Sequence, residues 1–442
     1  MKRAIIVVAV FSCLPPSSFA QSAVRLSLAE AITRGFENSH RLAEARAREA
    51  GAQAAATTAD LADKPTFNAN AGYMRINHVR PFGFPRPDGV IVLVYPDIPD
   101  NFTSRLSFQW PIYTSGRSDA LERAAVAEAQ AAGADVATAR ADLRLEIVRA
   151  YWAAVTAREA ERVLEESTAR AEAQVTDAKN RFDVGLIPPN EVSTLEAQRS
   201  RERAQLIEAA NIRESAAIEL RRLIGVAPST VLELTDSLES TAATPLATGE
   251  VSDVIKQALE ARPERQALSF RMGGAEERQK AALTQTKPTV AFAGGFDYAH
   301  PNRKIFPVVK RWDESWDVGV NVNWNFFDFG RAKSQANEAA AVVTAARARI
   351  AEFDSIVSAD VRQRLLDVES SQAMVRAATD AVRSAAEARR VVIDRVGAGV
   401  ATSTDVLIAQ VQLLESELVR TRALAGVRLA EARLERALGR QP

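Results

Sequence analysis

The chain has 442 residues, in which 56 lysines and arginines balance 56 aspartates and glutamates. This neutral balance excludes the basic surplus that nucleic-acid-binding proteins carry. Hydrophobic residues at 47% and charged residues at 25% are typical of a folded globular protein and unlike a bundle of apolar transmembrane helices. One cysteine and three histidines leave too few ligands for thiolate–histidine zinc sites, disulfide frameworks or iron–sulfur clusters.

The start of the chain has the pattern of a signal peptide over residues 1–20. A basic pair precedes an apolar stretch, and the segment ends in small residues at Ala20. Cleavage after Ala20 would place the mature chain outside the cytoplasm and remove Cys13. The alternative is a lipid-anchored Cys13, which the bulky Phe11 two residues before it disfavours, because lipoprotein signals prefer a small residue there.

The remainder of the chain reads as two copies of one unit, and internal repeats of this kind decide the whole fold. Lys64-Pro65-Thr66 recurs as Lys287-Pro288-Thr289, 223 residues later. Eight further residues recur at a constant offset of 214: Trp110, Gly116, Arg117, Arg181, Gly185, Val192, Gln198 and Gly225 reappear as Trp324, Gly330, Arg331, Arg395, Gly399, Val406, Gln412 and Gly439. We assign repeat one to 21–245 and repeat two to 246–442.

Each repeat is predicted to begin with a helix that ends before the Lys-Pro motif. In repeat one, Ser27 and Glu30 have the spacing of a capping box at the helix start. The nine extra residues of repeat one fall after this helix, among prolines. Prolines in both repeats predict irregular loops over 77–101 and 299–315.

Strands flank these loops. Apolar and polar residues alternate over 316–326, which predicts an amphipathic β-strand. Weaker alternation predicts three more strands, over 65–76, 102–113 and 288–298. Strands of about ten residues can cross an outer membrane when tilted. Aromatic residues suited to a membrane-interface girdle lie near the strand ends: Trp110, Tyr113, Trp324 and Phe327.

Two very long helices follow the strands, starting near Arg117 and Arg331. Gly185 and Gly399 lie 68 positions after these arginines, and no proline intervenes. At 1.5 Å per residue such a helix is about 100 Å long. Glycine-containing breaks over 185–190 and 397–404 precede returning helices, so each repeat ends in a helical hairpin.

The four predicted strands raise a problem of closure. The smallest membrane barrels need about eight strands, and open sheet edges are not tolerated in lipid. Several chains must therefore share one barrel. Two, three or four copies would supply about 8, 12 or 16 strands, and the same symmetry would gather the hairpins into a tube.

In this order of elements, nearly the whole mature chain resembles the TolC-like outer-membrane efflux and secretion channels. Val184-Gly185-Leu186 and Gly399-Val400, each followed by an acid, Glu191 or Asp405, are similar to the family's periplasmic hairpin tips. The junctions Gly116-Arg117 and Gly330-Arg331 are similar to its strand–helix junctions. The resemblance implies a mainly α fold with membrane β: a periplasmic tunnel of α-helical coiled-coil hairpins and a trimeric 12-stranded β-barrel. It also implies that the loops over 77–101 and 299–315 are extracellular.

The resemblance also implies a function and partners. The chain would be a passive exit duct in the outer membrane of a Gram-negative bacterium, without a cofactor and extending into the periplasm. A periplasmic adaptor (membrane fusion) protein and an inner-membrane transporter would open and supply it. The adaptor would dock on the hairpin tips, at Val184, Gly185, Leu186, Gly399 and Val400. Asp405, with Glu191 nearby, would form the periplasmic pore constriction.

Simpler roles remain open for the same residues. Gly185 and Gly399 can be C-terminal helix stops, which any hairpin needs. Thr402 and Asp405 have capping-box spacing, so Asp405 can serve its own helix. The sequence also departs from the family's closed-state features. Ile408 occupies the position of the family's second acid. Val396 and Ala401 occupy the positions of the tyrosine and the arginine that hold some members of the family closed.

We predict no catalytic, metal or cofactor site. His40 lies in the first helix, and His78 and His300 lie in or beside the loops, so none pairs with a nucleophile on the long helices. The alternative from another class is a secreted trimeric coiled-coil adhesin or structural spacer. The duplicated order of helix, strands and hairpin argues against it, because a spacer needs few returning turns.

Overall fold

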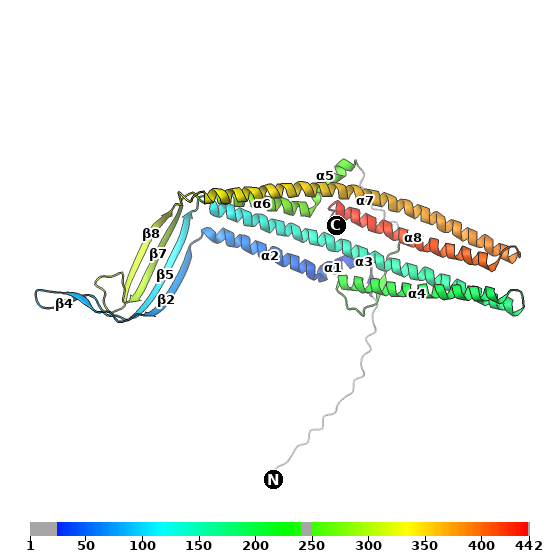
Figure 1. Cartoon of the computed structure of the whole chain (residues 1–442), viewed down its shortest axis with the longest axis horizontal. Coiled ribbons are helices and arrows are strands. Elements are labelled where there is room, and N and C mark those ends of the chain that lie inside the picture. Colours follow the sequence, from blue (N-terminus) through cyan, green and yellow to red (C-terminus); the bar gives the residue numbers. More distant parts are fainter. Residues whose placement is uncertain (1–23, 240–249, 441–442) are drawn as a thin grey trace, which may run out of the picture. The chain divides into compact units, whose positions relative to one another are not determined.

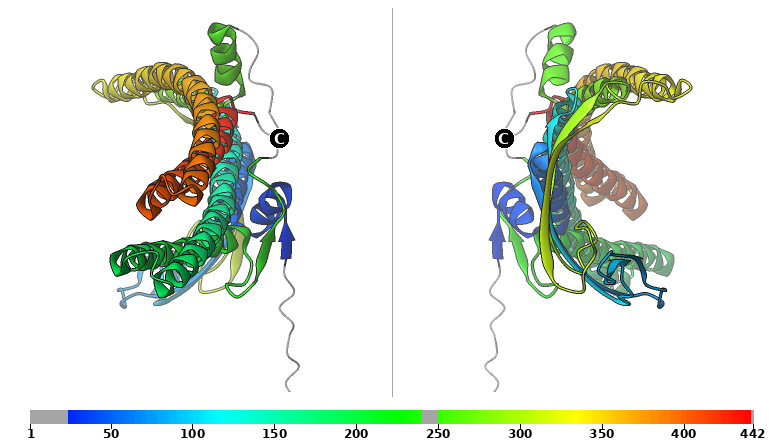
Figure 2. Two further views of the ribbon diagram at one scale, coloured as in Figure 1. Left: turned by 90° about the vertical axis from the view of Figure 1, so that its right-hand side faces the viewer. Right: turned by 90° about the vertical axis from the view of Figure 1, so that its left-hand side faces the viewer.

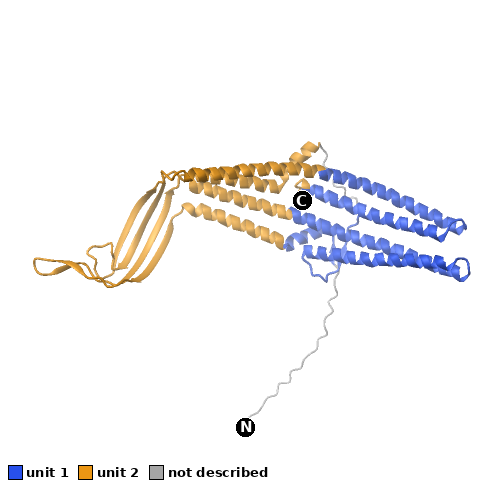
Figure 3. Cartoon of the chain, viewed as in Figure 1, with its two compact units in different colours: residues 1–39, 141–248, 363–436 blue, residues 40–140, 249–362, 437–442 orange. Residues whose placement is uncertain are grey.

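The computed structural model describes residues 24–239 and 250–440. The predicted signal peptide and Cys13 lie outside these residues. The chain divides into two compact units, shown in different colours in Figure 3. Unit 1 comprises 1–39, 141–248 and 363–436, and unit 2 comprises 40–140, 249–362 and 437–442. Helices α3 (Arg117–Asp183) and α7 (Arg331–Gly397) each contribute residues to both units.

The main elements follow the same order twice along the chain (Figure 1). The first series is α1 (Leu28–Asn38), α2 (His40–Asp60), β2 (Thr66–Arg75), β5 (Asp100–Tyr113), α3 and α4 (Pro189–Ile224). The second series is α5 (Val251–Ala261), α6 (Pro263–Leu283), β7 (Thr289–His300), β8 (Asp313–Asn323), α7 and α8 (Ser403–Ala437). Short elements complete the described fold: β1 (Val24–Leu26), the 3-10 helix η1 (Leu61–Asp63), β3 (Phe82–Pro85), β4 (Ile91–Tyr95) and β6 (Leu232–Leu234).

The first helix of each repeat is broken, where the sequence predicted one continuous helix. Ser39 separates α1 from α2, and Arg262 separates α5 from α6, each with an extended backbone. In the second case the cause is local, because Pro263 disfavours a helical conformation at the residue before it. The predicted capping box is confirmed: the Ser27 amide donates to the Glu30 carboxylate at 2.8 Å, and the Glu30 amide donates to the Ser27 hydroxyl at 3.3 Å.

The four long strands of unit 2 form one antiparallel sheet in the order β2-β5-β7-β8. Figure 2 shows these strands as a curved layer. In the register, Arg105 of β5 lies opposite Asn70 of β2 and Asp297 of β7, so these side chains share one face. Their neighbours Ala69, Leu106 and Phe296 share the other. The alternation predicted from the sequence therefore gives the sheet a polar and an apolar face.

The membership of each face follows from the same pairing. The polar face carries Thr66, Asn68, Asn70, Thr103, Arg105, Ser107, Gln109, Asp297, Asp317, Asn321 and Asn323. The apolar face carries Phe67, Tyr73, Phe102, Leu106, Phe108, Trp110, Phe292, Phe296, Trp316, Val318, Val320 and Val322. Large side chains of the apolar face, Phe67 and Trp316 among them, are exposed within the chain.

One strand prediction and one loop prediction need correction. The strand predicted over 316–326 runs instead over 313–323 as β8, because its partner β7 starts at Thr289, opposite Asn323. The loop predicted to be irregular over 77–101 contains the antiparallel hairpin β3–β4. Its strands have four and five residues, too short for alternation to stand out among the prolines.

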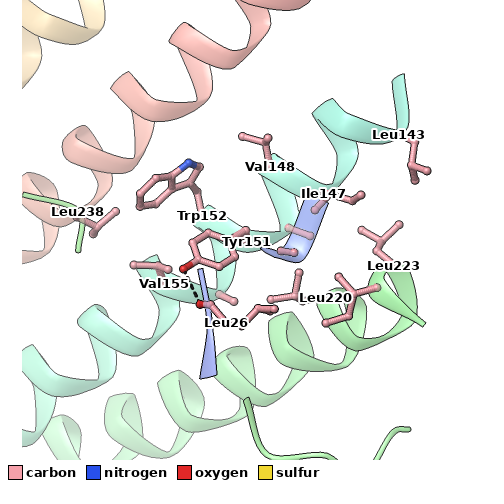
Figure 4. Close-up of a cluster of buried hydrophobic side chains, with 14 residues drawn as sticks. Leu26, Leu143, Ile147, Val148, Tyr151, Trp152, Val155, Leu220, Leu223 and Leu238 are labelled. Atoms are coloured by element: carbon pink, nitrogen blue, oxygen red, sulfur yellow. Dashed lines mark hydrogen bonds between the residues drawn. The ribbon is translucent and has the colours of Figure 1, made fainter. Parts of the chain in front are cut away.

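The core of unit 1 lies around Tyr151 of α3, which is fully buried (Figure 4). Its hydroxyl lies 2.7 Å from the Asp236 carboxylate and 3.0 Å from the Leu26 carbonyl. Burial raises the pKa of this hydroxyl, so it remains a proton donor. The contact joins α3 to the ends of β1 and β6, a parallel pair that the sequence did not reveal.

Among the described residues, no helix combines the length and apolar character needed to cross a lipid bilayer.

Candidate functional site

The two hairpin tips, both in unit 1, end their first helices in the same way. In the first tip, the Gly185 amide donates to the Phe182 carbonyl and the Leu186 amide donates to the Arg181 carbonyl, both at 2.8 Å. In the second, Gly399 and Val400 donate to the carbonyls of Val396 and Arg395, both at 3.0 Å. These pairs of bonds define a Schellman motif, which satisfies the last free carbonyls of a helix.

The glycines of these motifs need their left-handed backbone. Gly185 has φ of 77° and Gly399 has φ of 75°, a region that side chains with a Cβ rarely adopt. An added Cβ would meet no atom within 4 Å at either position, so the space beside the tip is open. The role as helix stops is therefore confirmed for both glycines. Adaptor docking remains a separate prediction.

Apolar side chains project at both tips. Val184 is 70% exposed, Leu186 is 73% exposed and Val400 is 64% exposed. A helix stop does not require apolar residues at these positions. Exposed apolar residues gathered at one end of a hairpin are typical of a contact surface.

The second tip starts its returning helix with a capping box. The Thr402 amide donates to the Asp405 carboxylate at 2.8 Å, and the Asp405 amide donates to the Thr402 hydroxyl at 3.3 Å. The predicted capping role of Asp405 is confirmed. The bond from the Thr402 backbone, aided by the Thr402 hydroxyl, lowers the pKa of the Asp405 carboxyl. Asp405 therefore carries its negative charge at neutral pH.

The first tip cannot form the same box. The cap position before α4 is Pro188, which has no amide hydrogen to donate to an acid three residues later. Glu191 instead accepts a hydrogen bond from the Ser403 hydroxyl of the other hairpin, at 2.8 Å. This bond joins the first turns of α4 and α8 within one chain. It places Glu191 beside Ser403, two residues before Asp405 in the sequence.

The sequence prediction missed this contact, although a signal was present. At the offset of 214, Pro188 and Pro189 correspond to Thr402 and Ser403. Repeat two therefore has hydroxyl groups at both positions. In repeat one, Pro188 has no amide hydrogen that could be donated to Glu191.

A groove of about 450 Å³ lies beside the tips within unit 1. It is lined by residues of α3, α4, α7 and α8, including Arg170, Arg389 and Ser403. The Nε atom of Arg389 is buried without a hydrogen-bond partner among the described residues. Burial and the neighbouring Arg170 charge lower the pKa of this guanidinium. Its counterpart in repeat one is the buried Val175, so the charge was visible in the repeat alignment.

The two strand–helix junctions, in unit 2, also share one geometry. Gly116 and Gly330 have φ of 79° and 85°, and each follows a second left-handed residue, Ser115 or Phe329. The next residues, Arg117 and Arg331, begin α3 and α7. A polar side chain two positions before each glycine then caps the helix: Thr114 accepts from Ser118, and Asp328 accepts from Ala332.

Within residues 24–239 and 250–440, no three His, Cys, Asp or Glu side chains group in a way that could hold a metal ion.

Solved outer-membrane channels share the fold of the chain. VceC from Vibrio cholerae matches with a TM-score of 0.77 and 21% identity, covering 93% of this chain and 96% of VceC. The open state of MtrE from Neisseria gonorrhoeae matches with a TM-score of 0.78 and 20% identity, covering 93% and 88%. CmeC from Campylobacter jejuni matches with a TM-score of 0.75 and 17% identity, covering 93% and 85%.

Sequence comparison identifies the family of the chain but no individual curated relative. No curated protein sequence matches the chain. The model of the outer membrane efflux protein family matches residues 32–226 and 254–440, which include both hairpins and all four long strands. The chain therefore belongs to the outer membrane efflux protein family and is located in the outer membrane.

Proposed function

We propose that three copies of this chain form the outer-membrane exit duct of a tripartite efflux or type I secretion system. The duct is passive, and a periplasmic adaptor protein and an inner-membrane transporter open and supply it. The observation that carries this proposal is the two-faced sheet with unpaired outer edges. Family membership supports the channel function, and the sheet supports the way in which the channel is built.

The sheet edges argue for sharing between chains. In the sheet order, β2 and β8 each have one neighbour, so the described residues leave two edges open. Each backbone N–H or C=O group left without a hydrogen bond in hydrocarbon costs roughly several kcal/mol of free energy. A sheet in a membrane must therefore close on itself. Pairing β8 of one chain with β2 of the next closes the sheet, and three chains give about 12 strands, a size within the bacterial range.

The two faces then define the lumen. Aromatic and β-branched residues such as Phe108, Trp316 and Val320 face lipid, whereas Asn70, Arg105 and Asn321 line the water-filled interior. This is the outward-apolar, inward-polar pattern of membrane barrels. A coiled-coil spacer or adhesin has no use for such a sheet, which disfavours that alternative.

The hairpin tips supply the gate and the docking surface. Threefold symmetry brings three copies of Asp405 toward one axis, with Glu191 nearby. In each chain the bonds from Thr402 lower the pKa of Asp405, which opposes the rise that like charges in the ring would cause. A ring of carboxylates attracts cations into a narrow pore. The exposed Val184, Leu186 and Val400, together with Gly185 and Gly399, form the adaptor-docking surface.

Conductance across a planar bilayer tests the channel and its gate together. The purified protein should conduct, and multivalent cations added on the periplasmic side should block the current. Asp405→Ala should relieve that block, whereas Asp328→Ala, at a strand–helix junction, should leave it unchanged. Absence of conductance both without and with the adaptor would refute the channel. Unchanged block in Asp405→Ala would leave Asp405 as a helix cap alone.

A further inference from the structure

The segment between β7 and β8, residues 301–312, reaches back over the sheet of unit 2. The Nζ atom of Lys304 lies 2.6 Å from the Asp297 carboxylate and 2.7 Å from the Asp317 carboxylate. Both aspartates lie on the polar face, by the register of β7 and β8. The segment therefore crosses the polar face instead of extending away from the strand ends. We call residues 301–312 the strap.

Other contacts hold the strap at its base. Arg303 donates to the Asn101 side-chain carbonyl at 2.9 Å, again on the polar face. Asn302 is 3% exposed and donates to the Ser315 hydroxyl at 2.9 Å. At the far end of the strap, Trp312 stacks on Tyr298 of the apolar face, with ring centroids 5.0 Å apart. The strap thus contacts the polar face of the sheet through Arg303 and Lys304 and the apolar face through Trp312.

The first loop supports the strap from the side. A small cavity is lined jointly by residues of 76–101 and by Pro301, Arg303 and Val308. Because the two loops line one cavity, they pack as one layer at the loop end of the strands.

We propose that the strap narrows the extracellular mouth of the channel, and that Lys304 sets the size of the solutes that pass. This inference rests on the proposed function, in which the polar face lines the lumen. Three straps, one from each chain, would project inward at the same level. The site is distinct from the carboxylate ring at the periplasmic tips, because it lies on the sheet.

The bonding pattern makes Lys304 a releasable anchor. Arg105 contacts the same two aspartates, Asp297 at 2.6 Å and Asp317 at 3.0 Å. If Lys304 lost its charge, Arg105 would still form an ion pair with each aspartate, so the sheet would keep these two contacts, with one positive charge facing two negative charges. The Lys304 side chain is 47% exposed, and exposed ion pairs are weak and sensitive to salt. Loss of Lys304 should therefore free the strap without unfolding the sheet.

Thiol labelling from outside the cell can test the strap independently of the periplasmic gate. The only cysteine in the sequence is Cys13, in the predicted signal peptide, so an introduced cysteine has no background. Ser107 lies on the polar face, two residues beyond Arg105 in the direction away from the loops. In Ser107→Cys, we would compare a small membrane-impermeant maleimide with a bulky maleimide–polyethylene glycol, both added to intact cells.

The strap proposal predicts slow labelling by the bulky reagent and rapid labelling by the small one. Adding Lys304→Met should accelerate bulky labelling several-fold and leave small-reagent labelling unchanged, and Lys304→Arg should restore slow bulky labelling. Lys310→Met, with the same charge change in the same strap, is the matched control and should have no effect. Equal bulky labelling in Lys304→Met and Lys310→Met would overturn the proposal.

Two further arms keep the test decisive. If Lys304→Met fails to assemble, raising the salt concentration with Lys304 intact should still accelerate bulky labelling, and an unchanged rate would reject the strap. If the small reagent labels Leu106→Cys and not Ser107→Cys, the polar face does not line a lumen. That outcome would refute the proposed channel architecture and not the strap alone.

Discussion

The two hairpin tips stop their first helices with the same Schellman motif but start their second helices differently. In tip two, Thr402 and Asp405 bind each other in a capping box. In tip one, Pro188 offers no amide, and Glu191 binds the Ser403 hydroxyl of the other hairpin. A single missing N–H group therefore redirects the equivalent acid from its own helix to its neighbour. The two repeats thus share the turn that ends the first helix, but the acid that follows the turn has a different hydrogen-bond partner in each.

This difference bears on how the tips are held. The tyrosine and arginine ties of the resembled channels are matched here by Val396 and Ala401, which cannot form them. The bond between Glu191 and Ser403 instead joins the first turn of α4 to the first turn of α8. We infer that this bond restrains the two hairpins relative to each other. It is one neutral-to-charged bond per chain, so it should contribute about 1.5–3 kcal/mol at most.

Bulky substitution of the tip glycines should have the largest effect. Gly185→Leu with Gly399→Leu places two side chains in left-handed backbone, at a cost of about 1–2 kcal/mol each. Export should be lost because both tip surfaces distort, while the sheet and trimer assembly persist. Efflux in cells and native gels measure the two properties.

The matched control for this prediction is Gly397→Leu. Gly397 ends α7 without a positive φ, and nothing lies within 4 Å of its added Cβ. That variant should export normally. Normal export by the double variant as well would reduce Gly185 and Gly399 to interchangeable turn residues.

Breaking the capping box of tip two should have a smaller, local effect. Thr402→Ala removes the hydroxyl that caps α8 and should cost about 1 kcal/mol. Hydrogen exchange should become faster over the first turn of α8 and stay unchanged over the first turn of α4. Equal exchange in the variant and the original protein would show that the box does not stabilise the tip.

A double-mutant cycle can measure the tie between the hairpins. Ser403→Ala with Glu191→Gln should show a coupling free energy of about 1 kcal/mol by hydrogen exchange at the tips. In a Pro188→Ser background, Glu191 gains an amide in its own turn, and the coupling should shrink. Unchanged coupling in that background would contradict the account of why the two acids differ.

Acid should loosen tip two only at low pH. The pKa of Asp405 is lowered in the folded state, so its contribution to stability is complete above the unfolded value, about 4. That contribution is lost as the pH falls through the folded value. Protection of the first turn of α8 should therefore be constant from neutral pH to about pH 5 and fall below about pH 4. In Thr402→Ala the dependence should weaken, because the hydroxyl bond to the Asp405 carboxylate is lost and only the backbone amide of residue 402 remains as its donor.

The sequence predicted features that depend on local pattern. The capping boxes at Ser27 and Thr402 and the alternation along β8 depend on residues close together in the sequence. The long helices α3 and α7 follow from uninterrupted stretches without proline. The helix stops at Gly185 and Gly399 were predictable for the same reason.

Features that depend on contacts between distant segments were missed. The parallel pair β1–β6 has three residues per strand and joins segments about 200 residues apart in the sequence, too short for a periodic signal. The break at Ser39 has no proline to mark it. The bond between Glu191 and Ser403, and the anchor from Lys304 to Asp297 and Asp317, require the register of elements that only the fold provides.

The number of chains in the detergent-solubilised protein tests the central claim most directly. A sheet of four strands with two open edges should close only by pairing with other copies. Native mass spectrometry of the mature protein in mild detergent should give three chains per particle, unchanged on dilution. A stable monomer that conducts across a bilayer would contradict the shared barrel.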